Sequence, residues 1–388
     1  MAYKVFQNGF PLNASELNNY LMNQSVIVFA TATARDTDLT APLEGMIVWL
    51  QDSNKFVYYT GTAWADVIPS TGSGNAIING AFDIWQRGTS FSNPSTNSFT
   101  ADRYYIVHDG SGATRTISQQ TFTPGTAPVA GYEGQYFYRY NQSVAGSGGT
   151  YASIVHKVED VRTYAGQTVT FSFWAKADSA RTLGVYWTQM FGSGGSSQVD
   201  VNFGNASVTT SWTRFTLTAA LPAITGKTVG NGSNLQLQFV LPINTTQTID
   251  IWGLQLESGS TATPFKRNAP SIQGELAACQ RYYWRTGTIG AGTQWSTVGL
   301  SISTSSVYFG VTNPVPMRIT PTSVDYAFPA VSSAGTGYNG GTLTQVSNGS
   351  NNTFCTVSYN HTSAALTTDR SYLAGLAGNG YIGFSAEL

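Results

Sequence analysis

The sequence predicts a mainly β protein, and three observations support this. Between residues 168 and 257, apolar and polar residues alternate along several short stretches, and clusters of Gly, Ser, Asn and Pro separate them. Alternation with a period of two places one set of side chains in a core and the other in water. β-branched and aromatic residues are frequent there, and no helical spacing intervenes. Successive strands of this kind predict an antiparallel β-sandwich.

This central sandwich is expected to span residues 76–267. A Ser/Gly-rich segment over residues 68–75 has the composition of a linker and separates it from what precedes. The strands that the alternation predicts most clearly are 168–177, 183–189, 212–218, 235–241 and 249–257.

Residues 1–70 predict a small leading α+β module. Asn13 and Glu16 have the spacing of a capping box, which predicts a short helix over residues 14–22. A strand over residues 25–30 and a hairpin of strands 45–51 and 55–60 follow, joined by a polar turn. A unit of this size buries little apolar surface alone, so we expect neighbouring copies to complete it.

Residues 268–388 predict a C-terminal β-sandwich or barrel. Helical spacing over residues 271–281 precedes a strand at 282–285, and Gly-rich residues 335–341 predict a flexible loop. Further strands are expected at 296–303, 306–311, 318–322, 354–359 and 381–388.

Composition narrows the classes of function. Charged residues make up 10% of the chain, against about 25% in typical proteins. The 19 basic and 20 acidic residues form no basic stripe, which argues against nucleic acid as a partner. No run of 18 apolar residues occurs and the N-terminus does not resemble a signal peptide, so we expect no membrane span. A neutral surface rich in hydroxyls, amides and aromatic rings fits either contact with sugars or the shielded surface of an oligomer.

The residues that could carry catalysis or bind a metal are scattered. His108, His156 and His361 stand alone, without the spacing of a zinc site, and we expect no metal and no cofactor. A glycosidase needs two carboxylates at a fixed separation. The acidic candidates are few and lie far apart in the sequence, and we expect no enzyme activity: Glu159, Asp160, Asp200 and Asp250.

Sugar recognition requires flat aromatic faces beside amides and hydroxyls. Trp187 and Gln189 supply both kinds of group on one predicted strand, with Trp187 as an exposed platform. Only one of Trp187 and its neighbour Tyr186 can point into the core. Tyr136 and Tyr138 make a second candidate row on one face of another strand. The alternative interpretation is that these aromatic residues fill a wide core.

Several segments resemble bacteriophage fibre proteins. "Tyr-Thr-Gly-Thr" at 59–62 and "Trp-Ala-Asp-Val" at 64–67 resemble small modules near the N-termini of phage tail and head fibres. Other segments resemble the jelly-roll domains of phage tail-fibre and receptor-binding proteins, which are similar to the carbohydrate-binding modules of xylanases and cellulases. They are "Asn-Gly-Ala-Phe-Asp-Ile-Trp-Gln-Arg-Gly" at 79–88, "Ala-Asp-Arg-Tyr" at 101–104, "Phe-Ser-Phe-Trp-Ala-Lys" at 171–176 and "Leu-Gln-Leu-Glu-Ser-Gly" at 254–259. "Gln-Arg-Tyr-Tyr" at 280–283 and "Phe-Ser-Ala-Glu-Leu" at 384–388 resemble phage fibre tips.

The resemblance implies a virion structural protein of the fibre or receptor-binding kind, assembled in the cytoplasm of the bacterial host. It implies a homotrimer, anchored to other virion proteins by the N-terminal module, that binds host surface polysaccharide. In the cellulase-type modules an acidic residue near the last strand helps to hold a calcium ion. Asp250 occupies a similar place, and we expect it to be a hydrated surface residue. Two alternatives stay open: a catalytic polysaccharide depolymerase, and a purely architectural head, collar or tail decoration protein.

Overall fold

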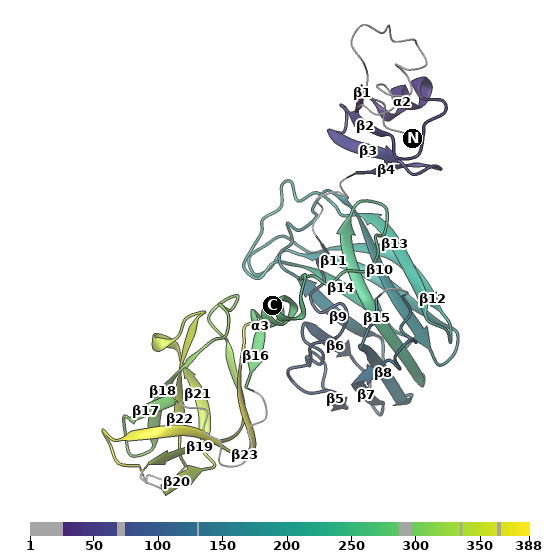
Figure 1. Cartoon of the computed structure of the whole chain (residues 1–388). Coiled ribbons are helices and arrows are strands. Elements are labelled where there is room, and N and C mark those ends of the chain that lie inside the picture. The colour runs from purple at the N-terminus through teal and green to yellow at the C-terminus, as the bar shows by residue number, and fades with distance from the viewer. Residues whose placement is uncertain (1–25, 68–73, 130–131, 287–296, 334–335, 363–365) are drawn as a thin grey trace, which may run out of the picture. The chain divides into compact units, whose positions relative to one another are not determined.

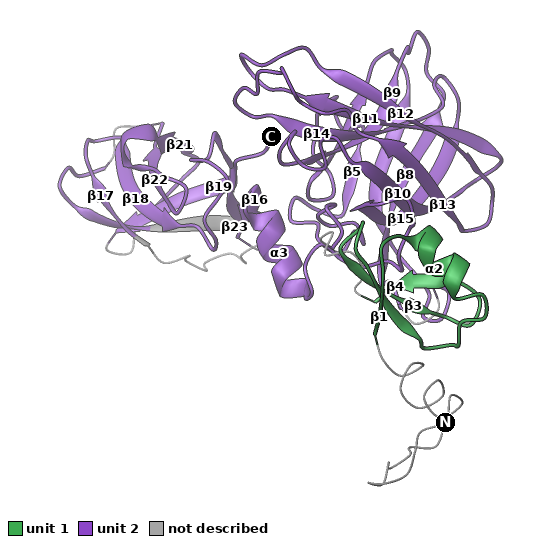
Figure 2. Ribbon diagram, turned by 90° about the horizontal axis from the view of Figure 1, so that it is seen from above, with its two compact units in different colours: residues 1–73 green, residues 74–388 purple. Residues whose placement is uncertain are grey.

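The computed structural model describes residues 26–67, 74–129, 132–286, 297–333, 336–362 and 366–388. The chain forms two compact units, residues 1–73 and residues 74–388 (Figures 1 and 2). The described residues are mainly β, as the sequence predicts, with several antiparallel sheets and two α-helices.

Over residues 26–67, the first unit forms a four-stranded sheet with one short helix. Its strands lie in the order β1-β2-β3-β4 (Figure 1). The expected strand and hairpin are present, and β1 pairs in parallel with β2. The bounds are β1 Ile27–Phe29, β2 Ile47–Leu50, β3 Lys55–Tyr59 and β4 Trp64–Asp66.

The helix of this unit, α2 (Ala32–Asp38), was not expected from the sequence. It begins where the Thr31 hydroxyl accepts a hydrogen bond from the Ala34 amide at 3.1 Å, which satisfies one of the free N–H groups of the first turn. The helix expected over residues 14–22 and most of the expected linker, residues 68–73, lie outside the described residues.

The central region is a sandwich of two antiparallel sheets. The six-stranded sheet has the order β13-β10-β15-β8-β7-β5, and the five-stranded sheet has the order β12-β11-β14-β9-β6. In the first sheet the strands are β5 Ser90–Ser92, β7 Thr114–Thr121, β8 Tyr136–Val144, β10 Thr168–Ala177, β13 Thr213–Ala220 and β15 Gln247–Ser258. In the second they are β6 Tyr104–His108, β9 Ala152–Val158, β11 Arg181–Met190, β12 Val199–Val208 and β14 Asn234–Val240.

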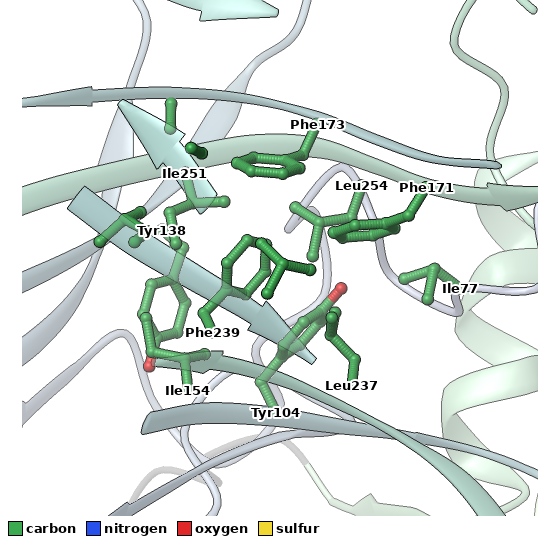
Figure 3. Close-up of a cluster of buried hydrophobic side chains, with 14 of the residues drawn as sticks. Ile77, Tyr104, Tyr138, Ile154, Phe171, Phe173, Leu237, Phe239, Ile251 and Leu254 are labelled. Atoms are coloured by element: carbon green, nitrogen blue, oxygen red, sulfur yellow. The ribbon is translucent and has the colours of Figure 1, made fainter. Parts of the chain in front are cut away.

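One continuous apolar core fills the space between these two sheets (Figure 3). Phe171 and Phe173 of β10 lie against Phe239 of β14, with ring centroids 5.7 and 4.8 Å apart. These three side chains are at most 1% exposed. The period-two alternation of the sequence therefore places alternate residues of the facing strands in one core.

The C-terminal region begins with helix α3 (Ile272–Gln280), which Ser271 caps through a hydrogen bond from the Gly274 amide at 3.1 Å. An eight-stranded sheet follows, in the order β20-β19-β23-β17-β18-β22-β21, with β16 also paired to β23. Its own apolar core includes Phe309, Tyr359 and Phe384. The bounds are β16 Tyr283–Arg285, β17 Thr297–Ser301, β18 Ser306–Thr312, β19 Ser323–Ser333, β20 Thr336–Asn339, β21 Thr342–Val346, β22 Phe354–Asn360 and β23 Ser371–Ser385.

Two expectations for this region are wrong. The strand expected at 318–322 is irregular chain, and the strand starts at Ser323. Pro321 lacks the N–H group that a sheet ladder needs, which accounts for the late start. The segment 335–341, expected to be a loop, contains β20 instead. This strand pairs antiparallel with β19 and places Tyr338 opposite Val331.

Four of the segments that resemble fibre proteins, 79–88, 101–104, 280–283 and 384–388, meet where the sandwich joins the C-terminal region. The Arg103 guanidinium donates to the Glu387 carboxylate, and Arg87 lies 3.2 Å from Glu387 and 3.4 Å from Asp102. The Arg103 guanidinium also lies 3.5 Å from the centroid of the Tyr282 ring. A buried network of charges therefore joins the two β-regions within the second unit.

Both cysteines, Cys279 and Cys355, are buried and free. No helix within the described ranges is long and apolar enough to cross a membrane.

Candidate functional site

The outer face of the six-stranded sheet is covered by the protein's own aromatic side chains. Trp174 pairs with Trp252 across β10 and β15, and the two rings lie 5.3 Å apart. Trp252 also packs against Phe122 and Phe265, which come from outside those strands, at 6.0 and 4.9 Å. Trp174, Trp252, Phe122 and Phe265 are all buried. This face therefore offers little aromatic surface to a ligand.

The five-stranded sheet presents a different outer face. Along β11 the side chains of Leu183, Val185 and Trp187 point into the core and are fully buried. The alternate residues, Tyr186 and Thr188, therefore belong to the outer face. The register extends this face across the neighbouring strands, with Asn202, Gln238, Gln236 and Asp200 opposite them.

These outer side chains form a connected polar surface around one aromatic ring. The Thr188 hydroxyl donates to Asp200 at 2.7 Å and lies 3.4 Å from the Gln238 amide nitrogen. Tyr186 is half-buried, and Asn202 and Asp200 on the adjoining strand are exposed. In the register, Tyr186 pairs with Gln238 on one neighbouring strand and with Asn202 on the other, and its ring reaches over Gly184 of its own strand.

This outer face continues toward β9 and β6. Gln236 is opposite Lys157 in the register, and the Tyr105 hydroxyl donates to the Gln236 side chain at 3.3 Å. The Lys157 ammonium lies 5.2 Å from the centroid of the Tyr105 ring. We call the surface formed by Tyr186, Asp200, Asn202, Gln236 and Gln238 the sheet face; Thr188 lies beneath it and is 1% exposed.

The chemistry of the sheet face suits a neutral hydroxylated ligand. An aromatic ring can stack on the C–H surface of a sugar ring, while amides both donate to and accept from its hydroxyl groups. The side chains come from strands of one sheet, so the fold fixes their spacing before any ligand binds.

The structure does not place Trp187 where the sequence interpretation put it. Trp187 is 0% exposed, and its ring packs 5.6 Å from Phe171 of the opposite sheet. The expectation of an exposed platform is therefore wrong, because the larger ring of the Tyr186–Trp187 pair fills the sandwich. Gln189 follows on the same side, is 1% exposed, and donates to the Pro222 carbonyl at 2.9 Å.

Tyr136 and Tyr138 lie on β8, in the other sheet. Tyr138 is fully buried, with its hydroxyl 3.3 Å from that of Thr100, so it belongs to the core. Tyr136 is half-buried, and its hydroxyl accepts a hydrogen bond from the side-chain amide of Gln135 at 2.9 Å. The structure therefore does not bring the four expected residues together into one site.

Asp250 also differs from expectation. The sequence interpretation made it a hydrated surface residue, but it is 2% exposed. Arg139 donates to its two carboxylate oxygens at 2.7 and 2.8 Å, and the Lys176 ammonium lies 3.6 Å away. Two cations on the neighbouring strands compensate the burial of this carboxylate. Within the described residues, no group of three or more His, Cys, Asp or Glu side chains could hold a metal ion.

The sequence already indicates which side of strand β11 points away from the core. Leu183, Val185 and Trp187 form an apolar row at alternate positions, whereas Tyr186 shares its row with Gly184 and Thr188. The apolar row marks the core side of a half-buried strand. The continuation of the sheet face onto β12 and β14 depends on strand pairings that the sequence does not reveal.

No family model matches the sequence, and a search of curated proteins finds no match either. Among solved structures, the chain is similar to the enzymatically active domain of bacteriophage CBA120 tailspike protein 4, with 14% identity and a TM-score of 0.32. That similarity covers 48% of this chain and 21% of the tailspike chain.

Carbohydrate-binding modules also appear among the similar structures. A CBM4 structure shares 19% identity over 47% of this chain and 98% of its own, with a TM-score of 0.29. The family 11 carbohydrate-binding module of a Clostridium thermocellum cellulosomal cellulase shares 12% identity, with 45% and 98% covered and a TM-score of 0.27.

Proposed function

We propose that this chain is a bacteriophage virion structural protein of the fibre or receptor-binding type that binds host surface glycan without catalysis. The observation that carries the proposal is the half-buried Tyr186 on the sheet face, which pairs in the register with Asn202 on one side and Gln238 on the other. The fibre-like sequence motifs support the virion role, and the protein would be assembled in the cytoplasm of the bacterial host.

The binding would consist of weak contacts multiplied by several copies. One partly exposed ring and a few amides give a weak site, since each hydrogen bond to a sugar replaces one to water. Several linked sites on one particle raise the overall affinity without any new contact. A homotrimer would supply three such faces for each fibre.

Apolar surface in the C-terminal region supports association of chains. Val298 of β17 and Leu373 of β23 are paired neighbours, and they are 64% and 40% exposed. Leu300, two residues along the same strand, is also exposed. Exposed apolar side chains that cluster on one sheet are typical of protein interfaces.

The first unit has a similar surface, which supports its role in attachment to other virion proteins. Val48 and Val57 lie in its core, while Ile47, Phe56 and Tyr58 on the alternate positions of β2 and β3 are exposed. A sheet with apolar residues on both faces needs a partner on the second face.

Competition for adsorption tests the proposal. Purified protein should block adsorption of the phage to its host, and Tyr186→Ala should block less well at equal concentration. The same protein incubated with host capsule or lipopolysaccharide should release no reducing ends. Release of reducing ends would instead identify a depolymerase, and full adsorption at saturating protein would identify a decoration protein without a ligand.

A further inference from the structure

A polar cavity of about 280 Å³ lies within the second unit, beside one end of the five-stranded sheet. Four segments line it: the loop after β9, the loop before β14, the irregular chain before β19, and Leu388 after β23. Its lining includes Glu159, Arg162, Asn231, Ser233 and Arg318.

The carboxylates of the cavity are already engaged. Glu159 accepts from the Tyr282 hydroxyl at 2.7 Å and pairs with Arg281 at 3.2 Å. Asp160 pairs with Arg162 at 2.5 Å and also accepts from the Arg162 amide at 2.6 Å. Neither carboxylate is therefore free to pair with Arg318.

Arg318 has a different set of partners. Its guanidinium donates to the main-chain oxygens of Ala386 and Glu387, each at 3.0 Å, and the ion pairs of the described residues give it no carboxylate. The Glu387 carboxylate itself pairs with Arg87 and Arg103. The half-buried Arg318 thus brings to the cavity wall a guanidinium that has no direct ion pair among the described residues, while the charge of the nearby Glu159 carboxylate favours its charged form.

Neighbouring cations reinforce this charge. Burial lowers the pKa of Arg318, the Glu159 carboxylate and Tyr282 oppose this, and the nearby Arg103 and Arg281 lower the pKa further. Burial and the same Arg103, together with Arg318, lower the pKa of Lys157, while Glu387 raises it. Lys157 donates to the main-chain oxygen of Leu388, which also lines the cavity, at 2.7 Å. An anion in the cavity would relieve the repulsion that remains among these cations.

The cavity adjoins the sheet face. Glu159 follows Val158, the last residue of β9, and Ser233 precedes Asn234, the first residue of β14. In the register, Lys157 and Gln236 are the outer-face pair nearest these two loops. A glycan on the sheet face could therefore extend one residue into the cavity.

We propose that this cavity binds the carboxylate of an acidic sugar residue, such as a uronic acid, through Arg162 and Arg318. The proposal rests on the glycan-binding function of the sheet face and names the class of glycan that fits it. Arginine suits this role because its planar fork donates two parallel hydrogen bonds to a carboxylate. Asn231 and Ser233 supply amide and hydroxyl groups for the hydroxyls of the same sugar.

Titration of the full-length protein with D-glucuronate and with D-glucose, followed by NMR, tests the proposal. Glucuronate should bind more tightly than glucose, and added salt should weaken it. Arg162→Gln should weaken glucuronate binding about tenfold, the effect of losing one charge-assisted hydrogen bond. Arg318→Lys should also weaken it, because it keeps the charge and loses the fork. Arg370→Gln, at an exposed arginine elsewhere, should change nothing.

The results separate this proposal from the function on which it rests. Equal binding of glucuronate and glucose, or unchanged glucuronate binding in both cavity variants, would overturn the cavity assignment even where Tyr186→Ala reduces glycan binding. Inorganic phosphate that binds more tightly than glucuronate, and loses affinity in the same variants, would also overturn the carboxylate assignment. If Tyr186→Ala changes the binding of no glycan while glucuronate still binds normally, the assignment of glycan binding to the sheet face is wrong and the cavity assignment stands.

Discussion

Arg103 and Glu387 are 284 residues apart in the sequence, yet the Arg103 guanidinium donates directly to the Glu387 carboxylate. The two side chains are 1% and 7% exposed. Arg103 also donates to the Lys157 carbonyl at 2.8 Å, so it ties the C-terminal segment to the strand that borders the sheet face. This pair therefore couples the stability of the C-terminal region to the sandwich.

Glu387→Gln should lower the free energy of unfolding by about 3 kcal/mol, because it leaves a buried guanidinium without its counter-charge. Asp178→Asn is the matched control. It removes the partner of Arg181 in a more exposed pair and should cost less than about 1 kcal/mol. Urea unfolding of both variants measures the two losses in the free energy of unfolding. Equal losses would show that the buried Arg103–Glu387 pair stabilises the protein no more than the exposed pair does.

Asp102 should make stability depend on pH. Burial raises its pKa to about 6, and Arg87 offsets part of that effect. The folded state therefore holds the proton more tightly than the unfolded chain, whose Asp pKa is about 3.9. The contribution of Asp102 to stability is full below the unfolded pKa and is lost as pH rises from about 4 to about 6. Asp102→Asn should remove this dependence. Across that pH range, the melting temperature of the variant should therefore fall less steeply with rising pH than that of the wild type.

Trp187→Ala and Tyr186→Ala should differ strongly in how much stability they cost, although the residues are adjacent. Trp187→Ala should cost about 3–5 kcal/mol of stability, because it opens a cavity between the sheets. Tyr186→Ala should cost less than about 1 kcal/mol, because its ring is partly in solvent. Thermal unfolding of both variants checks the assignment of faces, and a larger loss for Tyr186 would reverse it.

Phe56→Ser together with Tyr58→Ser should reduce the amount of this protein on purified particles. Both rings lie exposed on the outer face of the first unit's sheet, where we expect another virion protein to bind. Asp52→Asn, in the turn before β3, is the control and should leave the amount unchanged. Quantitative immunoblotting of particles carrying each variant gives the answer, and wild-type amounts of the double variant would place the attachment surface elsewhere.

Sequence periodicity predicted β10, β11, β13, β14 and β15 of the sandwich, because alternation is a local property of each strand, but it did not predict β7, β9 or β12. Periodicity did not show which side chains on the outer face of each sheet stay exposed to solvent. Asp250 lies between Ile249 and Ile251, which fixes its direction, but the aromatic cover over its sheet comes from distant segments. The partners of Arg103 and Arg318 come from the far end of the chain, so the sequence offers no spacing from which to infer them.

Glycan binding measured on an array, with the wild type, Tyr186→Ala and Tyr136→Ala side by side, tests the central claim most directly. The two tyrosines are both half-buried and lie on different sheets. We predict that Tyr186→Ala loses most of the signal on the glycans that the wild type binds, while Tyr136→Ala keeps it. Loss in Tyr136→Ala with full binding by Tyr186→Ala would contradict the assignment of the ligand to the five-stranded sheet.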